Sequence, residues 1–310
     1  MADTPVQNFG PLPDTLTFGP FGPDGDIIVH IENLVLGCSP YVENIGVPDP
    51  CLLDEIVSIT SNGTELQLSP HTTTGYYTVR DSSDNITTYS TEEGQYVGPD
   101  TYDIWPSDDS GINSGNFTDI QFTSDNGTAT NDVVDLSGVP CVPAFEFHGL
   151  GLASIDTSLI TKTEIFILSD MDVSDFDLSE MPYITGLYIT HMPLTSLDIT
   201  PLLDLQQCEI QFLNITSIDI SQNTSFEGCN MVDNSLLSTV ILSALPLCTS
   251  ITFQGCALGQ TSVDNILIAA AANGLAVSVH LEGGTNAAPS ATGLAAKTTI
   301  EGNGGTVYIN

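Results

Sequence analysis

Carboxylates at regular spacing are the first residues in this sequence whose type and position could do chemistry. Asp156, Asp177, Asp198 and Asp219 follow one another at intervals of 21 residues. If successive repeats stack as strands of a sheet, these carboxyl groups lie about 4.8 Å apart, close to the carboxyl separation of a retaining glycosidase. No pair among them stands out, so we interpret the series as structural. Stacked like charges predict a raised pKa or a bound counter-cation.

Other candidate sites give weaker patterns. Glu146 and Glu209 are three repeats apart, which is about 14 Å by strand spacing, whereas glycoside hydrolysis uses about 5 to 9.5 Å. The acidic stretches 81–85 and 108–113 offer oxygen ligands for Ca²⁺, but neither matches the twelve-residue EF-hand loop. The histidines show no i, i+4 pair that would suggest zinc; they are His30, His71, His148, His191 and His280. No nucleophile elbow, Walker loop or dinucleotide fingerprint is present. We therefore predict that the protein is not an enzyme and holds no cofactor, with Ca²⁺ binding left open.

Charge excludes one class of partner. The 310 residues carry 3 Lys+Arg against 39 Asp+Glu, a net charge of −36, so a nucleic-acid partner is not expected. Hydrophobic residues make up 41% of the chain, enough to fill a core. The longest apolar stretch, 266–272, is far shorter than the roughly 18 residues that span a bilayer. The N-terminal residues lack the basic and apolar regions of a secretory signal. We expect no membrane insertion.

Cysteines and glycosylation motifs each leave alternatives open. A disulfide between Cys38 and Cys51 is one reading, and free thiols are the other. The remaining cysteines are predicted to be small apolar core residues: Cys141, Cys208, Cys229, Cys248 and Cys256. Six N-x-[ST] motifs suit a glycosylated protein but also arise by chance in a chain rich in Asn, Ser and Thr; they begin at Asn62, Asn85, Asn116, Asn126, Asn214 and Asn223.

Residues 142–254 contain two interleaved series of heptapeptides. One, which we call the sheet series, starts at residues 142, 163, 184, 205, 226 and 248; the other starts at 152, 173, 194, 215 and 237. Positions 1, 4 and 6 of the heptapeptides are apolar, apart from Thr163 at position 1 and Thr157 at position 6. A constant period of this length indicates a solenoid whose coils stack to bury a common core. We predict one internal column from the sheet series: Phe145, Phe166, Leu187, Cys208, Cys229 and Ile251.

The repeats resemble the short, 21-residue variety of the leucine-rich repeat family. The matching segments are LTSLDI from Leu194 and ITSIDISQNT from Ile215. The resemblance covers about 142–257 and departs from the family in having fewer Asn pairs in the turns. It implies a parallel sheet along one side of a solenoid, which would run through residues 141–310.

The C-terminal segment predicts a cap over residues 258–310. A helix over 261–274 has a Thr or Ser N-cap, an Ala-rich interior and an Asn-Gly stop. A strand over 276–281, a second helix over 289–301 and a strand over 306–309 follow. The sheet of the whole 142–310 region then has about eight strands.

Residues 1–140 predict an antiparallel β-sandwich with an extended N-terminal arm. Short alternating stretches are separated by Gly, Pro, Asn and Asp clusters. The expected strands are 26–32, 55–60, 65–68, 76–80, 86–89 and 117–123. We therefore expect a mainly β protein with a few helices, divided into residues 1–140 and 141–310.

With the core positions assigned, the outward positions of the sheet series form a candidate recognition face. It combines amides, hydroxyls, an aromatic ring and exposed isoleucines. Its main residues are Ile167, Tyr188, Gln207, Glu209, Gln211, Asn230, Thr252 and Gln254, and Glu146, Ile165 and His280 extend it.

These features predict a non-catalytic structural or adhesion protein. We expect a component of the virion surface, such as a bacteriophage decoration, fibre or tail protein, that belongs to a larger assembly. Its partners would be other virion or surface proteins, or a glycan or protein on a host surface. The alternative is an extracellular or cell-surface leucine-rich-repeat adhesin of a bacterium. A glycan-degrading enzyme is a third hypothesis.

Overall fold

The structure, a computed structural model, describes residues 55–61, 66–92, 94–114, 116–124, 132–152 and 154–310. These residues are mainly β, with two α-helices. The strand expected over 26–32, the N-terminal arm and the pair Cys38 and Cys51 lie outside the described residues.

An antiparallel sheet of five strands comes first. Its order is β5 (Ile86–Ser90), β4 (Tyr76–Asp81), β7 (Asp100–Ser107), β1 (Val57–Ser61) and β9 (Val133–Asp135). Strand β7, its centre, was not predicted, because its sequence DTYDIWPS ends in a Pro-Ser pair typical of a turn. Tyr102 and Ile104 of β7 alternate with more exposed neighbours, so the strand buries one face.

A second antiparallel group joins this sheet to the solenoid. Strand β8 (Phe117–Ser124) pairs with β2 (Leu66–Leu68) and β3 (His71–Thr72), and β2 pairs with β6 (Gln95–Val97). The buried Tyr77 hydroxyl of β4 donates to the Leu68 carbonyl of β2 at 3.2 Å, so the two layers touch. Because residues 1–54 are not described, the sandwich over 1–140 stays a prediction.

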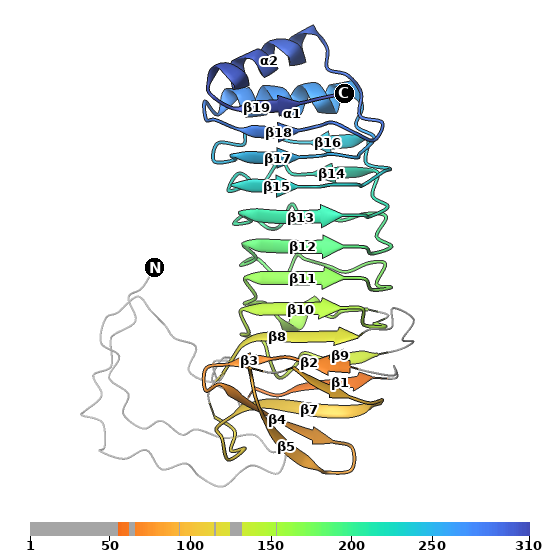
Figure 1. Ribbon diagram of the computed structural model, residues 1–310, viewed down its shortest axis with the longest axis vertical. Helices are drawn as coiled ribbons and strands as arrows, with labels where there is room; N and C mark the ends of the chain where they lie inside the picture. The colour runs from red at the N-terminus through yellow and green to blue at the C-terminus, as the bar shows by residue number, and fades with distance from the viewer. Residues whose placement is uncertain (1–54, 62–65, 93, 115, 125–131, 153) are drawn as a thin grey trace, which may run out of the picture. The chain divides into compact units, whose positions relative to one another are not determined.

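Strand β8 also starts the parallel sheet. Its other edge pairs in parallel with β10 (Ala144–His148), with Phe145 opposite Ile120. Eight parallel strands then stack in chain order (Figure 1). After β10 they are β11 (Ile165–Ser169), β12 (Gly186–Thr190), β13 (Gln207–Gln211), β15 (Gly228–Asn230), β17 (Ser250–Thr252), β18 (Ser278–His280) and β19 (Thr306–Tyr308).

The predicted core column is confirmed. Phe145, Phe166, Leu187, Cys208, Cys229 and Ile251 are directly opposite one another in successive strands. Positions 1, 4 and 6 of all six sheet-series heptapeptides are buried. On the far side of the coils, β14 (Ser217–Asp219) pairs in parallel with β16 (Thr239–Ile241). One side chain per coil cannot exclude water alone, so burial requires stacking.

Buried asparagines bind successive coils together, a feature that the sequence did not reveal. The fully buried Asn234 donates from Nδ2 to the Ile210 carbonyl at 2.6 Å and accepts from the Leu213 N–H at 2.9 Å. Asn223, also fully buried, donates to the carbonyls of Ile199 and Leu202. Each amide satisfies backbone groups that a turn leaves unpaired.

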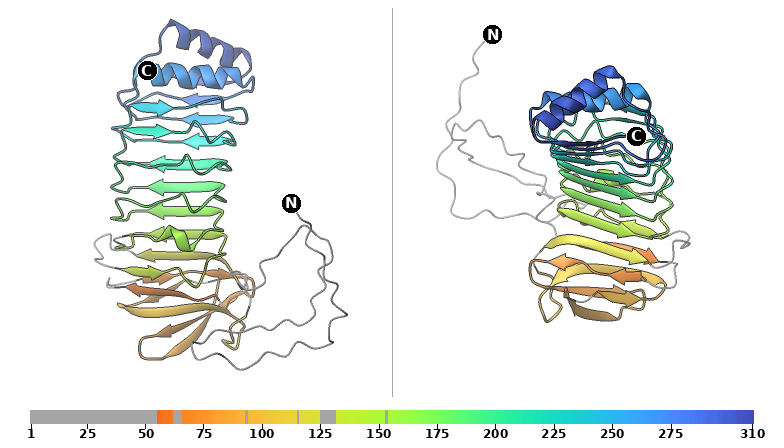
Figure 2. Two further views of the ribbon diagram at one scale, coloured as in Figure 1. Left: turned by 180° about the vertical axis from the view of Figure 1, so that it is seen from behind. Right: turned by 45° about the horizontal axis from the view of Figure 1, so that its top comes forward.

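The C-terminal cap has the predicted elements. Helix α1 (Gln260–Ala272) and helix α2 (Ala291–Gly302) lie at the end of the stack (Figures 1 and 2). The Asn-Gly stop is confirmed, since Asn273 is the C-cap and Gly274 has a φ of 71°. The predicted Thr or Ser N-cap is wrong: the N-cap is Gly259, so no side chain caps the first turn. Neither helix of the described residues is long and apolar enough to cross a membrane.

The cysteines follow the prediction with one correction. Cys208, Cys229, Cys248 and Cys256 are free, buried thiols. Cys141, predicted to be a core thiol, is disulfide-bonded instead. It precedes the first repeat, outside the stacked column, where the periodicity says nothing about its role.

Candidate functional site

The open face of the parallel sheet brings the predicted recognition residues together. Glu146, Ile167, Tyr188, Glu209, Asn230, Thr252 and His280 form one row, each opposite the next in the strand register. Ile165 and Gln207 lie in a parallel row on one side and Gln211 on the other, while Gln254 follows β17. All of them are exposed or partly exposed. We call this surface the recognition face; its role stays a prediction.

Two glycines make room for two large side chains on this face. A Cβ at Gly186 would lie 3.1 Å from Cε2 of Tyr188, so the tyrosine ring rests over the glycine. A Cβ at Gly228 would lie 2.4 Å from Oε1 of Gln207, so this amide covers the next glycine in the row. The glycines thus leave room for the ring and the amide to lie against the sheet.

Polar contacts hold the carboxylates of the face. Glu146 Oε1 lies 2.6 Å from Nε2 of His148, whose Nδ1 contacts the Ser169 hydroxyl. The Gln211 amide donates to Glu209 at 2.7 Å. Ser169, His148 and Glu146 are linked in the order of a hydrolytic triad, but Ser169 is only 8% exposed. The serine also contacts Nδ1 and the carboxylate Nε2, the reverse of the arrangement in the Ser-His-Asp triad.

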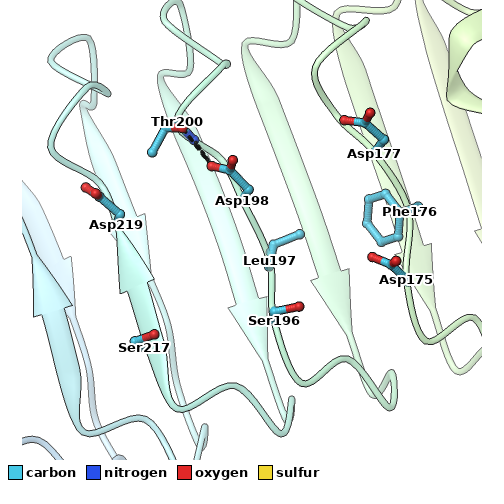
Figure 3. A pocket seen from close by; sticks show the side chains of 9 residues that line it. All are labelled: Asp175, Phe176, Asp177, Ser196, Leu197, Asp198, Thr200, Ser217 and Asp219. Atoms are coloured by element: carbon cyan, nitrogen blue, oxygen red, sulfur yellow. Dashed lines mark hydrogen bonds between the residues drawn. The ribbon is translucent and has the colours of Figure 1, made fainter.

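Three members of the predicted aspartate series, Asp177, Asp198 and Asp219, line a groove of about 720 Å³ on the far side of the coils. The fourth, Asp156, caps the short 3₁₀ helix Thr157–Leu159 instead. Figure 3 shows Asp177, Asp198 and Asp219 at equivalent places in successive coils. Each accepts a hydrogen bond from the backbone N–H two residues later, as Asp198 does from Thr200 at 2.9 Å. These carboxylates therefore close turns, which agrees with the structural interpretation.

The raised pKa expected from stacked like charges is wrong for Asp177 and Asp219, while the alternative, a bound counter-cation, stays a prediction. The backbone N–H of Ser179 holds the pKa of Asp177 below its ordinary value, and the Ser221 side chain, followed by its N–H, does the same for Asp219. Hydrogen bonds to the charged form outweigh repulsion between exposed carboxylates, because water screens the latter.

Each of the two acidic stretches considered for Ca²⁺ uses one carboxylate internally. Asp81 accepts hydrogen bonds from the N–H groups of Ser83 and Asn85, and Asp108 accepts them from Ser110 and Ile112. The Asn85 side chain is the main cause of the lowered pKa of Asp81, as the Ser110 side chain is for Asp108. Within the described ranges, no group of three or more His, Cys, Asp or Glu side chains converges on a point that could hold a metal ion.

A second ladder, absent from the sequence predictions, lies at the corner that follows each sheet-series strand from β10 to β17. Asp170, His191, Phe212 and Asp233 have φ values of 55°, 52°, 53° and 57°. Gly149 and Gly255 occupy the same corner at the two ends of the series, with φ values of 63° and 73°. We call these six residues the corner ladder. In the sequence, the ladder could have been found as the residue that directly follows each sheet-series heptapeptide, which is glycine after the first and the last of them.

Four residues of the corner ladder keep a side chain where glycine would be less strained. A left-handed conformation costs an ordinary residue roughly 1 to 2 kcal/mol, less for Asp and more for a bulky ring such as Phe212. The rings of His191 and Phe212 stack with centroids 4.3 Å apart and planes 13° from parallel. Nδ1 of His191 lies 3.9 Å from the Asp170 carboxylate. The stack and the carboxylate are thus presented together at the surface.

Comparisons with known proteins show limited similarity. No protein-family model matches the chain, and neither does any curated protein. One solved structure, the functional domain of InlJ from Listeria monocytogenes, which is described as including a cysteine ladder, is similar over 50% of this chain and 38% of its own, at 17% identity and a TM-score of 0.35. The match thus spans well under half of the length of that structure.

Proposed function

We propose that this chain is a leucine-rich-repeat protein that binds a partner through the recognition face and is displayed outside a cell. Within this proposal it is a non-catalytic structural or adhesion component of a virion surface, such as a bacteriophage decoration, fibre or tail protein. The single observation that carries the proposal is the set of exposed and partly exposed side chains that the parallel sheet aligns in neighbouring rows, among which Tyr188 and Gln207 lie over glycines.

Two further features support this proposal. The disulfide at Cys141 is typical of proteins that work in an oxidising environment. The net charge of −36 keeps closely packed copies soluble and repels anionic partners.

The binding role is tested by removing the two side chains that lie over the glycines. The double variant Tyr188→Ala/Gln207→Ala should lose adhesion of protein-coated beads to host cells or to isolated particles, while its far-ultraviolet spectrum stays unchanged. The matched control is Asp175→Asn/Asp204→Asn, two exposed residues away from the face. Equal adhesion of the face variant and the native chain would contradict the proposal.

The place of display is tested by immunogold electron microscopy of native particles and cells. Label on virions supports the virion component. Label on cell walls alone supports the alternative, a bacterial leucine-rich-repeat adhesin at the cell surface or in the medium. The enzyme hypothesis requires glycan cleavage that is lost in Glu209→Gln.

A further inference from the structure

A shallow cleft of about 500 Å³ lies along the corner ladder, where the chain leaves strands β11, β12 and β13. Three successive coils contribute to it: Asp170 and Asp172 from the first, His191 from the second, and Phe212 and Asn214 from the third. The buried side chains of Met171 and Met192 also line it. We call it the corner cleft.

The chemistry of the corner cleft suits a flat cation. The stacked rings of His191 and Phe212 expose aromatic surface, and 43% of Phe212 is open to solvent. The carboxylate of Asp172 is exposed and has no hydrogen-bond partner among the residues that the structure describes. Aromatic faces attract cations, and neighbouring carboxylates add charge-assisted hydrogen bonds.

The chain has no Lys or Arg of its own to fill this cleft. It contains only three such residues, and each is engaged elsewhere. Arg80 pairs with Asp103 at 2.5 Å, Lys162 lies 4.3 Å above the ring of Tyr183, and Lys297 pairs with Glu301. A cation in the cleft must therefore come from another molecule.

We propose that the corner cleft binds an arginine side chain of a partner protein. A planar guanidinium can stack on an aromatic face while its N–H groups reach a carboxylate, which the compact ammonium of lysine cannot do equally well. The stacked rings supply the platform, and Asp170 and Asp172 supply the acceptors.

The test uses the full chain and blocked peptides that each carry a single arginine, lysine or citrulline. Titration is followed by NMR of the His191 and Phe212 rings and by calorimetry. The arginine peptide should bind most tightly, and Phe212→Ala should weaken it about fivefold to tenfold. Asp170→Asn/Asp172→Asn should weaken it similarly, whereas Asp175→Asn/Asp204→Asn, which removes the same charge elsewhere, should not.

The control separates the cleft from the general acidity of the chain. Equal weakening by both double variants would show non-specific attraction and overturn the proposal. Equal affinity for lysine and arginine peptides, or full affinity in Phe212→Ala, would also overturn it. If a neutral sugar shifts the NMR signals of the Phe212 ring and the arginine peptide does not, the cleft binds a glycan and the proposal is overturned.

Discussion

Replacing Asn234 by alanine should open the solenoid locally. The substitution leaves the Ile210 carbonyl and the Leu213 N–H without their side-chain partners, at 2.6 and 2.9 Å in the native protein. An unsatisfied buried polar group costs about 1 to 3 kcal/mol, so two of them should lower the free energy of unfolding by about 2 to 6 kcal/mol. Each coil contacts only its neighbours, so the loss should concentrate in the two coils that Asn234 joins.

Two measurements check this expectation. Urea unfolding gives the change in stability, and hydrogen exchange with mass spectrometry should show faster exchange in peptides covering 207–214 and 228–234 than in β10 or the cap. The matched control is Asn214→Ala, an exposed asparagine one coil earlier, which should change stability by less than about 0.5 kcal/mol. Equal midpoints for the two variants, or exchange that rises evenly along the chain, would refute the reasoning.

A second substitution at the same site separates donor from acceptor. Asn234→Asp keeps an acceptor for Leu213 but places a carboxylate opposite the Ile210 carbonyl. At neutral pH it should be at least as damaging as alanine, because it buries a charge. Lowering the pH should restore part of the stability, since a protonated carboxyl can donate to that carbonyl.

Four further predictions concern other parts of the chain. Glu55 is buried, and desolvation raises its pKa although its carboxylate accepts a hydrogen bond from the Phe117 N–H at 2.5 Å. The stability that follows from this raised pKa is fully present below about pH 4.3, the ordinary pKa of Glu, and is lost as the pH rises through the folded-state pKa. Glu55→Gln, which keeps an acceptor, should therefore raise the urea midpoint at pH 7 and leave it unchanged near pH 4; no gain at pH 7 would contradict this. Burial raises the pKa of Cys248 and of Cys256 to about 11 each, so both thiols should react with a disulfide reagent only after unfolding, and rapid labelling of the native protein would count against the packed core. Asn223 is buried and its amide donates hydrogen bonds to two carbonyls, so a glycan attached there should block folding. Ser225→Ala removes the glycosylation motif and should therefore raise the yield of folded protein from a eukaryotic secretory host. An equal yield would contradict this prediction. Native protein should resist trypsin, because the chain offers only Arg80, Lys162 and Lys297 for cleavage. Of these, Arg80 lies in β4 and Lys297 in α2. Rapid digestion would argue against the closed fold.

The solenoid could be predicted because its period is carried by side chains that must be buried. Phe145, Phe166 and Leu187 recur at a fixed interval, and parallel strands place such residues opposite one another. The two helices of the cap followed from their Ala-rich interior and their stop signals. These features are local or periodic, so one sequence is enough to show them.

Other features depend on partners distant in the chain. The parallel pairing of β8 with β10 has no local signal, since β8 alternates as an antiparallel strand would. Asn223 and Asn234 look like ordinary turn residues until the neighbouring coil supplies their carbonyl partners. The corner ladder was missed because its position holds Gly, Asp, His and Phe in turn, and only a shared backbone conformation unites them.

The register that passes unbroken from β8 through β10 to β19 has a consequence for how such a chain can change length. Each 21-residue unit enters and leaves the sheet at the same place, so duplicating one unit would extend the stack by about 4.8 Å without altering the strands at either end. Deleting one would shorten it by the same amount. The repeated part can therefore be set to span a required distance, while β8 and the two C-terminal helices keep both ends closed.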